Sequence, residues 1–445
     1  MRLSTVLLLV LFIACFSCDD NSHVKVDLSG DLSDGGEGGD GDGDGDGDGD
    51  GDGDGDGDGD GNGDGGLDDD GGLHVKSSLI WIANTGEGTL SKVDTIKEHE
   101  IARYITSPLG AVKDGDPSRT SVNRHGDMAV ANRRHPGLYS ASTPASVTKF
   151  IADTEECADK NGDGFVTSTS GTDLKTWGKE DCMAWHTSLP SGIIGARALA
   201  WDGQEDAKTG KGGHVWVGTC MSAEKPGTQD YIYKLNGDTG EIMETVKFDA
   251  CAYGFVMAAD GYLWIMDKLI PAIHRLNTTD LTVETFEAEC GYGITIDTSG
   301  KVWAAGGTNR NCIARFDPAS SSFVVGSFDT SYRGRGLGTG IKKSAGYIWV
   351  ADELNHLIKI DEATTNYVES YDIGTPSSKL PGGNTVGVGI DYEGYVWLID
   401  MGNDAAYKFD PDTETFVTIP VGKKPYTYSD MTGVQLTNQI PIDII

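Results

Sequence analysis

A tryptophan recurs along most of this chain of 445 residues, each time inside a short apolar run. The segments "GYLWIMD" (261–267), "GYIWVAD" (346–352) and "GYVWLID" (394–400) are nearly the same. Successive tryptophans from Trp216 to Trp397 are separated by 48, 39, 46 and 48 residues. A repeat of this length indicates that one supersecondary unit is stacked many times.

Each unit has the same order of short apolar segments. The first strand leads through a turn to the second, which carries the tryptophan. The third strand contains a basic residue, an apolar residue and then Asp or Asn, and a fourth strand ends the unit. Four short strands in each repeat of about 40 to 50 residues are typical of a propeller blade.

We count seven such units between residues 73 and 440. The first, at 79–106, lacks its innermost strand, and "YSDMTGVQL" (428–436) supplies a lone strand that can close the ring. The sequence therefore predicts an all-β, seven-bladed β-propeller at 73–440, closed by a C-terminal strand and followed by a short tail at 441–445. The tryptophans are expected to pack between blades.

Residues 1–18 have the form of a secretory signal, in which one Arg precedes an apolar run ending in small residues and Cys. The run is too short for a comfortable transmembrane helix. Cysteine at the cleavage point predicts a bacterial lipoprotein lipidated at Cys15 or Cys18. The alternatives are an ordinary secretory signal and an uncleaved anchor. We therefore expect an exported protein, held by lipid in the bacterial cell envelope at the outer membrane or the cell surface.

Residues 19–72 form a Gly/Asp-rich segment, and the part from 31 to 72 contains 18 acidic side chains and no Lys or Arg. Such a segment buries no apolar surface and its like charges repel, which predicts a disordered tether. A calcium-binding repeat is the alternative, but the nonapeptide pattern requires an apolar residue in each repeat. Residues 1–72 contribute −19 to the net charge of −34, and 73–445 contribute −15. No basic stripe appears, so we expect no nucleic acid as a partner. We also expect a monomer.

Six cysteines follow the N-terminal segment, an even number that predicts disulfides in an exported chain. Cys220 ends a second strand and Cys251 opens the first strand of the next blade, so both should lie on the same rim. Cys290 precedes a first strand and Cys312 begins the third strand of the same blade, again on that rim. A Cys251–Cys290 bridge is the competing pairing. The predicted disulfides are Cys157–Cys182, Cys220–Cys251 and Cys290–Cys312.

An insertion at 153–190 interrupts the second unit. Its "DKNGDG" (159–164) spaces oxygens as at the start of an EF-hand calcium loop, but the twelfth position is Ser170 in place of Glu. The missing carboxylate would come from Asp173, Glu180 or Asp181. We predict a structural Ca²⁺, and the alternative is a turn that binds nothing. The predicted ligands are Asp159, Asn161, Asp163, the carbonyl of Phe165, and Asp173.

The third residue after each tryptophan should lie at the rim where the second strand of a blade ends. Three of these residues are carboxylates, namely Asp267, Asp352 and Asp400. Convergent oxygens suit a hard cation such as Mg²⁺ or Ca²⁺, so the set predicts a cation or polar-ligand site. The alternative is that each carboxylate begins a loop and accepts nearby backbone N–H groups.

The connections between blades share this rim and mix basic with aromatic residues. Arranged around a central depression they could bind a polar ligand, or several of them could only pack or pair locally. These residues are Arg119, Arg197, Tyr253, Tyr292, Arg333, Arg335 and Tyr426.

The repeat "G-I-x-x-D-x-x-G-x-V-W", followed by the basic-apolar-Asp strand, resembles that of the streptogramin B (virginiamycin B) lyase group of seven-bladed propellers over most of 73–440. The resemblance implies Mg²⁺ held by acidic residues at comparable positions, with a histidine acting in ring-opening elimination. No histidine stands two residues beyond a rim Asp here, and His356 is the only nearby one. Since elimination requires a placed base, His356 is the one catalytic candidate.

The favoured function is recognition of a surface ligand, whether glycan, peptide or small molecule, on the loop-bearing face. A Mg²⁺-dependent C–O lyase is the alternative, and a structural envelope protein is a further one. Convergence of the rim carboxylates and a histidine on one cation would favour the enzyme.

Overall fold

The computed structural model describes most of the chain from residue 78 onward. The predicted signal at 1–18 with its lipidation sites and the predicted linker at 19–72 lie outside the described residues, as does most of the predicted tail. None of the described helices has the length and apolar character needed to cross a membrane. The described residues are 78–108, 115–134, 144–160, 162, 164–166, 168–169, 173–224, 227–307, 311–329, 331–374 and 385–441.

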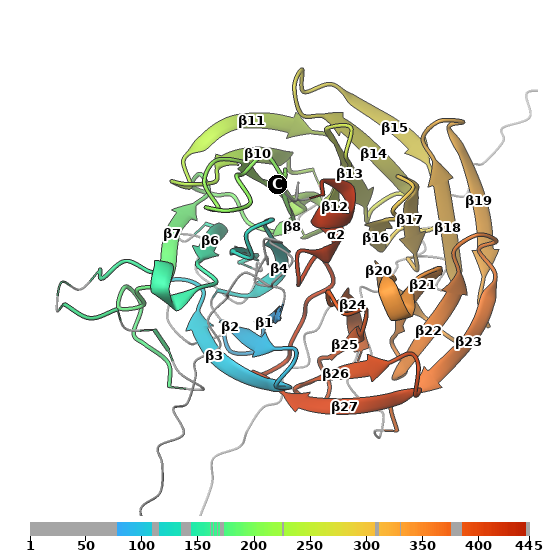
Figure 1. Ribbon diagram of the computed structural model, residues 1–445. Coiled ribbons are helices and arrows are strands. Elements are labelled where there is room, and N and C mark those ends of the chain that lie inside the picture. Colours follow the sequence, from blue (N-terminus) through green and yellow to red (C-terminus); the bar gives the residue numbers. More distant parts are fainter. Residues whose placement is uncertain are drawn as a thin grey trace, which may run out of the picture. The chain divides into compact units, whose positions relative to one another are not determined.

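Seven antiparallel sheets surround a common axis, which confirms the predicted seven-bladed propeller (Figure 1). The first blade has the three strands β1 (Leu79–Asn84), β2 (Thr89–Asp94) and β3 (His99–Ile105). The second has β4 (Pro117–Val122), β5 (Met128–Asn132), β6 (Ser146–Phe150) and β7 (Met183–Ser188). The third has β8 (Ala196–Trp201), β9 (His214–Thr219), β10 (Asp230–Asn236) and β11 (Ile242–Phe248).

The remaining four blades follow the same order from the axis outward. The fourth has β12 (Ala252–Met257), β13 (Tyr262–Asp267), β14 (Ala272–Asn277) and β15 (Val283–Glu287). The fifth has β16 (Gly293–Ile296), β17 (Val302–Ala305), β18 (Cys312–Asp317) and β19 (Ser322–Ser327). The sixth has β20 (Gly334–Thr339), β21 (Tyr347–Asp352), β22 (His356–Asp361) and β23 (Tyr367–Asp372). The seventh has β24 (Thr385–Ile390), β25 (Val396–Asp400), β26 (Ala405–Asp410) and β27 (Thr415–Pro420).

The repeated tryptophans fill the space between neighbouring blades, as predicted. Trp81 in β1 belongs to one buried cluster with Val122 and Val130 of the second blade. Trp264 shares a cluster with Ile296 of the fifth blade in the same way. Each aromatic side chain is removed from water, and burial on this scale stabilises the contact between blades.

In six of the seven blades the basic residue of the third strand lies directly across from the tryptophan of the second strand, and in the second blade Lys149 lies across from Ala129. In five blades the cation also sits over the indole ring, 5.3 to 5.6 Å from its centre, so cation–π attraction adds to the packing. This register explains why the repeat keeps a basic residue there. The cross-strand pairs are Trp81–Lys92, Trp216–Lys234, Trp264–Arg275, Trp303–Arg315, Trp349–Lys359 and Trp397–Lys408.

An extended segment at 425–431 closes the ring beside β1. The Tyr426 amide donates to the Ala83 carbonyl at 2.8 Å, and the Trp81 amide donates to the Met431 carbonyl at 2.9 Å. Gly387 of β24 makes the close approach possible, because a Cβ atom there would lie 1.7 Å from the Thr427 carbonyl. The predicted closure is therefore confirmed, although the segment lies a few residues before 428–436.

The second half of that predicted strand is helical. Gly433 takes a positive φ of 86°, which ends the extended segment, and α2 (Val434–Gln439) follows. Figure 1 shows α2 at the centre of the ring. The Gln439 side chain donates to the Asp297 carbonyl at 2.7 Å, fixing the helix to a turn of the fifth blade. Three other short elements are η1 (Thr154–Glu156), α1 (Met221–Glu224) and η2 (Lys342–Ser344).

All three predicted disulfides are present, and the competing Cys251–Cys290 pairing is excluded. Cys220 directly follows β9 and Cys251 directly precedes β12, so the two meet on one rim of adjacent blades. The bridges are Cys157–Cys182, Cys220–Cys251 and Cys290–Cys312.

Candidate ligand site

Arginine and tyrosine side chains gather around the axis where the innermost strands begin. The strands β4, β8, β12 and β20 each contribute a member, and the closing segment contributes two. We call this set the Arg/Tyr cluster; it consists of Arg119, Arg133, Arg197, Arg335, Tyr253, Tyr292, Tyr426 and Tyr428.

The tyrosine hydroxyls of the cluster converge on Tyr426. Its hydroxyl oxygen lies 2.9 Å from that of Tyr292, 3.4 Å from that of Tyr253 and 3.5 Å from that of Tyr428. Arg335 extends this network, because its Nη1 donates to the Tyr292 hydroxyl at 3.1 Å. Side chains from four separate parts of the chain thus form one continuous polar network on the axis.

Two of the arginines form ion pairs with carboxylates of the described residues. Arg133 Nη2 lies 2.5 Å from an oxygen of Asp116, and Arg335 Nη2 lies 2.8 Å from an oxygen of Glu353. Both pairs are largely buried, and their opposite charges compensate one another. These ion pairs therefore give the corresponding arginines a structural role.

Arg119 forms no ion pair with any carboxylate of the described residues, although its side chain is completely buried. Among the described residues, its guanidinium makes two long hydrogen bonds, to the carbonyls of Ser118 at 3.4 Å and Tyr253 at 3.3 Å, and its Nε has no partner there. The group stacks on Tyr428, 3.2 Å from the ring centre. Five N–H donors in a fixed fork suit a carboxylate or phosphate, so Arg119 keeps unused capacity for an anion.

Burial and the buried arginines act in opposite directions on the pKa values of the tyrosines in the cluster. Burial lowers the pKa of Arg119 to about 10, because the charged form is desolvated. Burial acts to raise the pKa of Tyr253, but the charges of Arg197 and Arg119 outweigh it and lower that pKa below its ordinary value. Burial raises the pKa of Tyr426. A positive potential that favours a phenolate also favours a bound anion.

Six of the seven residues predicted for this rim belong to the cluster. The seventh, Arg333, has a side chain that is 49% exposed and lies 3.6 Å from Glu353. Sequence reasoning missed Arg133 and Tyr428. Tyr428 could have been predicted from the sequence, because it lies two residues after Tyr426 and alternate residues of an extended segment share one face.

The three rim carboxylates each bind the backbone of their own blade or its nearest loop. Asp267 accepts the Leu269 amide at 2.8 Å, and Asp400 accepts the Gly402 amide at 2.7 Å. These contacts are Asx turns, in which a carboxylate satisfies loop N–H groups. All three side chains are almost fully buried. The third position after the tryptophan thus has a structural use in the fourth, sixth and seventh blades.

Asp352 shows the same arrangement with more partners. One oxygen accepts the Arg333 amide at 2.5 Å, and the other accepts the Leu354 amide at 3.0 Å. That second oxygen also lies 3.0 Å from Nδ1 of His356. The structure therefore brings His356 to one rim carboxylate. A rim cation would have to replace hydrogen bonds that already exist, so that site stays a prediction.

Within the described part of the chain, one group of three His, Cys, Asp or Glu side chains has ligand atoms within 4.8 Å of one another: His125, Asp127 and Glu156. Asp127 is already occupied there, since one oxygen lies 3.1 Å from Lys149 Nζ and the other accepts the Ala152 amide at 3.0 Å. This group does not include any predicted ligand.

The insertion shows a turn held by Asp159. Its two carboxylate oxygens accept the amides of Gly162 and Gly164 at 2.7 and 2.8 Å. Glu180 accepts the Cys182 amide at 3.1 Å, so this candidate for the missing carboxylate also serves the backbone. Asn161 and Asp163 lie outside the described residues, while Phe165 and Asp173 have exposed side chains. The predicted Ca²⁺ stays a prediction.

No protein-family model matches the chain, and no curated protein matches it in sequence. Among solved structures, it is similar to a functionally unknown protein from Desulfotomaculum acetoxidans, with a TM-score of 0.51 and 9% identity over 79% of this chain and 99% of that chain. Virginiamycin B lyase from Staphylococcus aureus gives a TM-score of 0.48 and 14% identity over 71% of this chain and 89% of that chain. Dihydro-heme d1 dehydrogenase NirN gives a TM-score of 0.47 and 11% identity over 79% of this chain and 74% of that chain. Similarity at such low identity concerns the fold alone.

Proposed function

We propose that this propeller binds an anionic ligand at the Arg/Tyr cluster on its loop-bearing face. The observation that carries the proposal is Arg119, a fully buried cation without a carboxylate partner among the described residues. Burying an unpaired charge costs several kcal/mol, and proteins normally compensate it with a counter-charge or a ligand. A bound anion would supply the missing charge.

The chemistry of the cluster indicates the ligand class. Arginine forks recognise carboxylate and phosphate groups, while tyrosine rings and hydroxyls contact sugar or aromatic surfaces beside such a group. We therefore assign an acidic small molecule, or an acidic group of a glycan or peptide, to this site. The signal segment with its cysteines and the acidic tether support display of the domain from the cell envelope as a further part of the proposal.

The test uses tyrosine ionisation as its signal. Inorganic phosphate and acetate are titrated separately into the full-length protein at fixed alkaline pH, with chloride at matched ionic strength as the baseline. An anion beside Arg119 weakens the positive potential at Tyr253, so the pKa of Tyr253 rises and tyrosinate absorbance falls saturably. The change should disappear in Arg119→Met.

The matched control is Arg103→Met, which removes an arginine paired with Glu100 on the outer strand of the first blade. This variant should respond as the wild type does. If neither anion causes a saturable change in the wild type, or if Arg119→Met responds equally, the assignment of the cluster as an anion site is wrong.

A second candidate function rests on the pair formed by His356 and Asp352. A carboxylate 3.0 Å from Nδ1 orients an imidazole as a general base, which is what elimination requires. The rim carboxylates already accept hydrogen bonds from loop amides, so a Mg²⁺ ion would have to displace some of these bonds, and the Mg²⁺ site stays part of the proposal. If the lyase alternative holds, purified protein should linearise a streptogramin B-type cyclic ester, and His356→Ala should abolish this. If the folded protein does not linearise the ester, the lyase alternative is wrong for that substrate class.

A further inference from the structure

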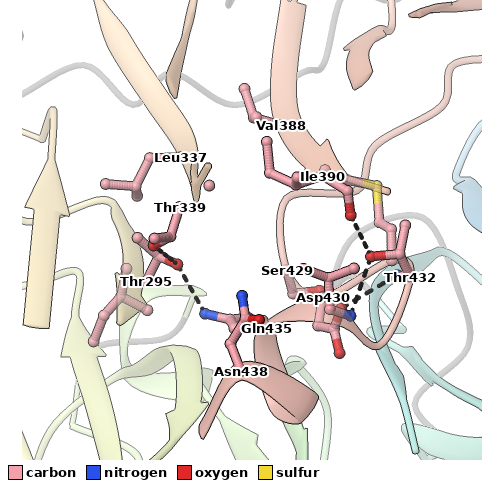
Figure 2. Close-up of a pocket in the computed structure, with 15 residues that line it drawn as sticks. Thr295, Leu337, Thr339, Val388, Ile390, Ser429, Asp430, Thr432, Gln435 and Asn438 are labelled. Carbon is pink, nitrogen blue, oxygen red and sulfur yellow. Dashed lines mark hydrogen bonds between the residues drawn. The ribbon is translucent and has the colours of Figure 1, made fainter. Parts of the chain in front are cut away.

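The axis of the propeller holds a small cavity beside the closing segment. It has a volume of about 30 Å³ and lies between the inner strands β16, β20 and β24 on one side and α2 on the other (Figure 2). A smaller cavity of about 10 Å³ lies next to β8 and β12. Two residues line both cavities, Asp430 and Gln435. A volume of this size holds one or two water molecules or a single ion.

Asp430 is a carboxylate with one unused oxygen. Its Oδ1 accepts the amides of Thr432 and Gly433 at 3.2 and 2.8 Å. Its Oδ2 is shielded from solvent and has no hydrogen-bond partner of good geometry among the described residues, although the backbone N–H of Val122 also acts on this carboxylate. Burial raises the pKa of Asp430 to about 6, and backbone amides are the only groups that act against this rise. No lysine or arginine of the described residues pairs with it, so its negative charge is uncompensated.

Neutral oxygens surround the same cavity. The Gln435 side chain donates its amide N–H to the Thr295 hydroxyl at 3.0 Å, which leaves its amide oxygen as an acceptor. Asn438, one turn further along α2, also lines the cavity (Figure 2). Hard cations prefer carboxylate and amide oxygens completed by water. Water alone could satisfy Oδ2 as an acceptor but would not neutralise its charge.

We propose that Asp430 binds a hard metal cation in this axial cavity, with Gln435 and Asn438 of α2 as neutral oxygen ligands. One carboxylate balances the single charge of Na⁺, and Ca²⁺ is the divalent candidate with the same ligand preference. Such an ion would fix α2 to the closing segment. The site is independent of the Arg/Tyr cluster and of the predicted calcium loop in the insertion.

The first experiment compares melting temperatures of the full-length protein in sodium and choline chloride at equal ionic strength, and with and without Ca²⁺ in choline chloride. A cation that binds only the folded state, at about 100 times its Kd, should raise Tm by about 3 °C for a propeller of this size. Asp430→Asn keeps the shape but loses the charge, so it should lose the response. Asp280→Asn, in an exposed turn, should keep it. A response to sodium chloride identifies Na⁺ as the ion, and a response to Ca²⁺ in choline chloride identifies Ca²⁺.

The Ca²⁺ arm is repeated in an Asp163→Ala background, which removes the insertion as a source of the shift. Crystals soaked in Rb⁺ or Sr²⁺ give a second readout that does not depend on folding of the variant. An anomalous peak beside Asp430 Oδ2 would support the site. An equal Tm response in Asp430→Asn, or no response and no peak in the wild type, would show that the cavity holds water only.

Discussion

Two buried arginines of the Arg/Tyr cluster lie close together but differ in their partners. Arg133 is neutralised by Asp116 at 2.5 Å, whereas Arg119 has aromatic rings and two backbone carbonyls around it. Breaking a buried ion pair leaves the other charge stranded, but removing an uncompensated charge relieves a desolvation cost. Neighbouring side chains of the same type should therefore respond to mutation in opposite ways.

We predict that Arg133→Met lowers the free energy of unfolding by about 3 to 5 kcal/mol, because Asp116 is left buried without a partner. Arg119→Met should leave the ligand-free protein unchanged or slightly more stable, since lost cation–π contacts of about 2 kcal/mol offset the relief of burial. Equilibrium urea unfolding of both variants in anion-poor buffer measures the difference. A loss as large for Arg119→Met as for Arg133→Met would mean that Arg119 is a structural residue.

The rim carboxylates show where sequence reasoning reaches its limit at the residue scale. Asp400 accepts the Gly402 amide. An Asp that binds a cation would stand at the same place in the loop, so the sequence is the same in both cases. Only the positions of the neighbouring N–H groups separate the two uses, and these depend on the local turn. The pattern predicted correctly that the three residues end the second strands, but it could not predict what their oxygens contact.

At the scale of elements, the insertion between β6 and β7 is closed by Cys157–Cys182 and by turns that its own carboxylates stabilise. Asp159 already holds the turn that an EF-hand-like ion would share. We predict that removing calcium with a chelator increases proteolysis within 157–182 while leaving the unfolding of the seven blades nearly unchanged, because the loop lies outside the strands of the blades. Limited proteolysis with mass spectrometric mapping measures this.

Asp163→Ala should reproduce the effect of the chelator in calcium-loaded protein, since the predicted site would lose a charged ligand. Asp206→Ala, in an exposed turn of the third blade, serves as the control and should leave the cleavage pattern of the insertion intact. Equal protease resistance with and without calcium would show that the disulfide alone holds the loop.

The closing segment and α2 show why some elements resist prediction. The sequence predicted a lone closing strand at 428–436, and the first part of this segment is extended. The helix then starts after Gly433, because packing of Leu436 against the third blade stabilises one and a half turns that are too short to be recognised from periodicity. Tertiary contacts decide such elements, and they are absent from the local sequence.

At the scale of the whole molecule, the blade count made the long-range predictions possible. Cys220 and Cys251 are far apart in sequence, and only the order of strands within blades brings them to one rim. The same count predicted that residues opening the inner strands meet at the axis, as Arg119 and Tyr253 do. The function does not follow from the number of blades, because the same architecture binds many different ligands. Which ligand is bound depends on individual side chains at the site.

Closure of the ring belongs to this scale as well, since 425–431 joins the first blade to the last. The segment bonds β1 through Tyr426 and Met431 and lies against Gly387 of β24, so it fills the inner position that the first blade lacks. We predict that a variant ending at Lys424 melts about 10 °C or more below the full-length protein, because buried side chains such as Trp397 lose their cover. Differential scanning calorimetry measures the change.

Two further truncations separate the contributions to closure. A variant ending at Pro441 keeps both the closing segment and α2 and should melt as the full-length chain does. A variant ending at Gly433 keeps the closing segment but loses α2, so it should fall between the other two. If the variant ending at Lys424 melts like the full-length protein, packing between blades alone holds the ring, and the hydrogen bonds from 425–431 to β1 contribute little to its stability.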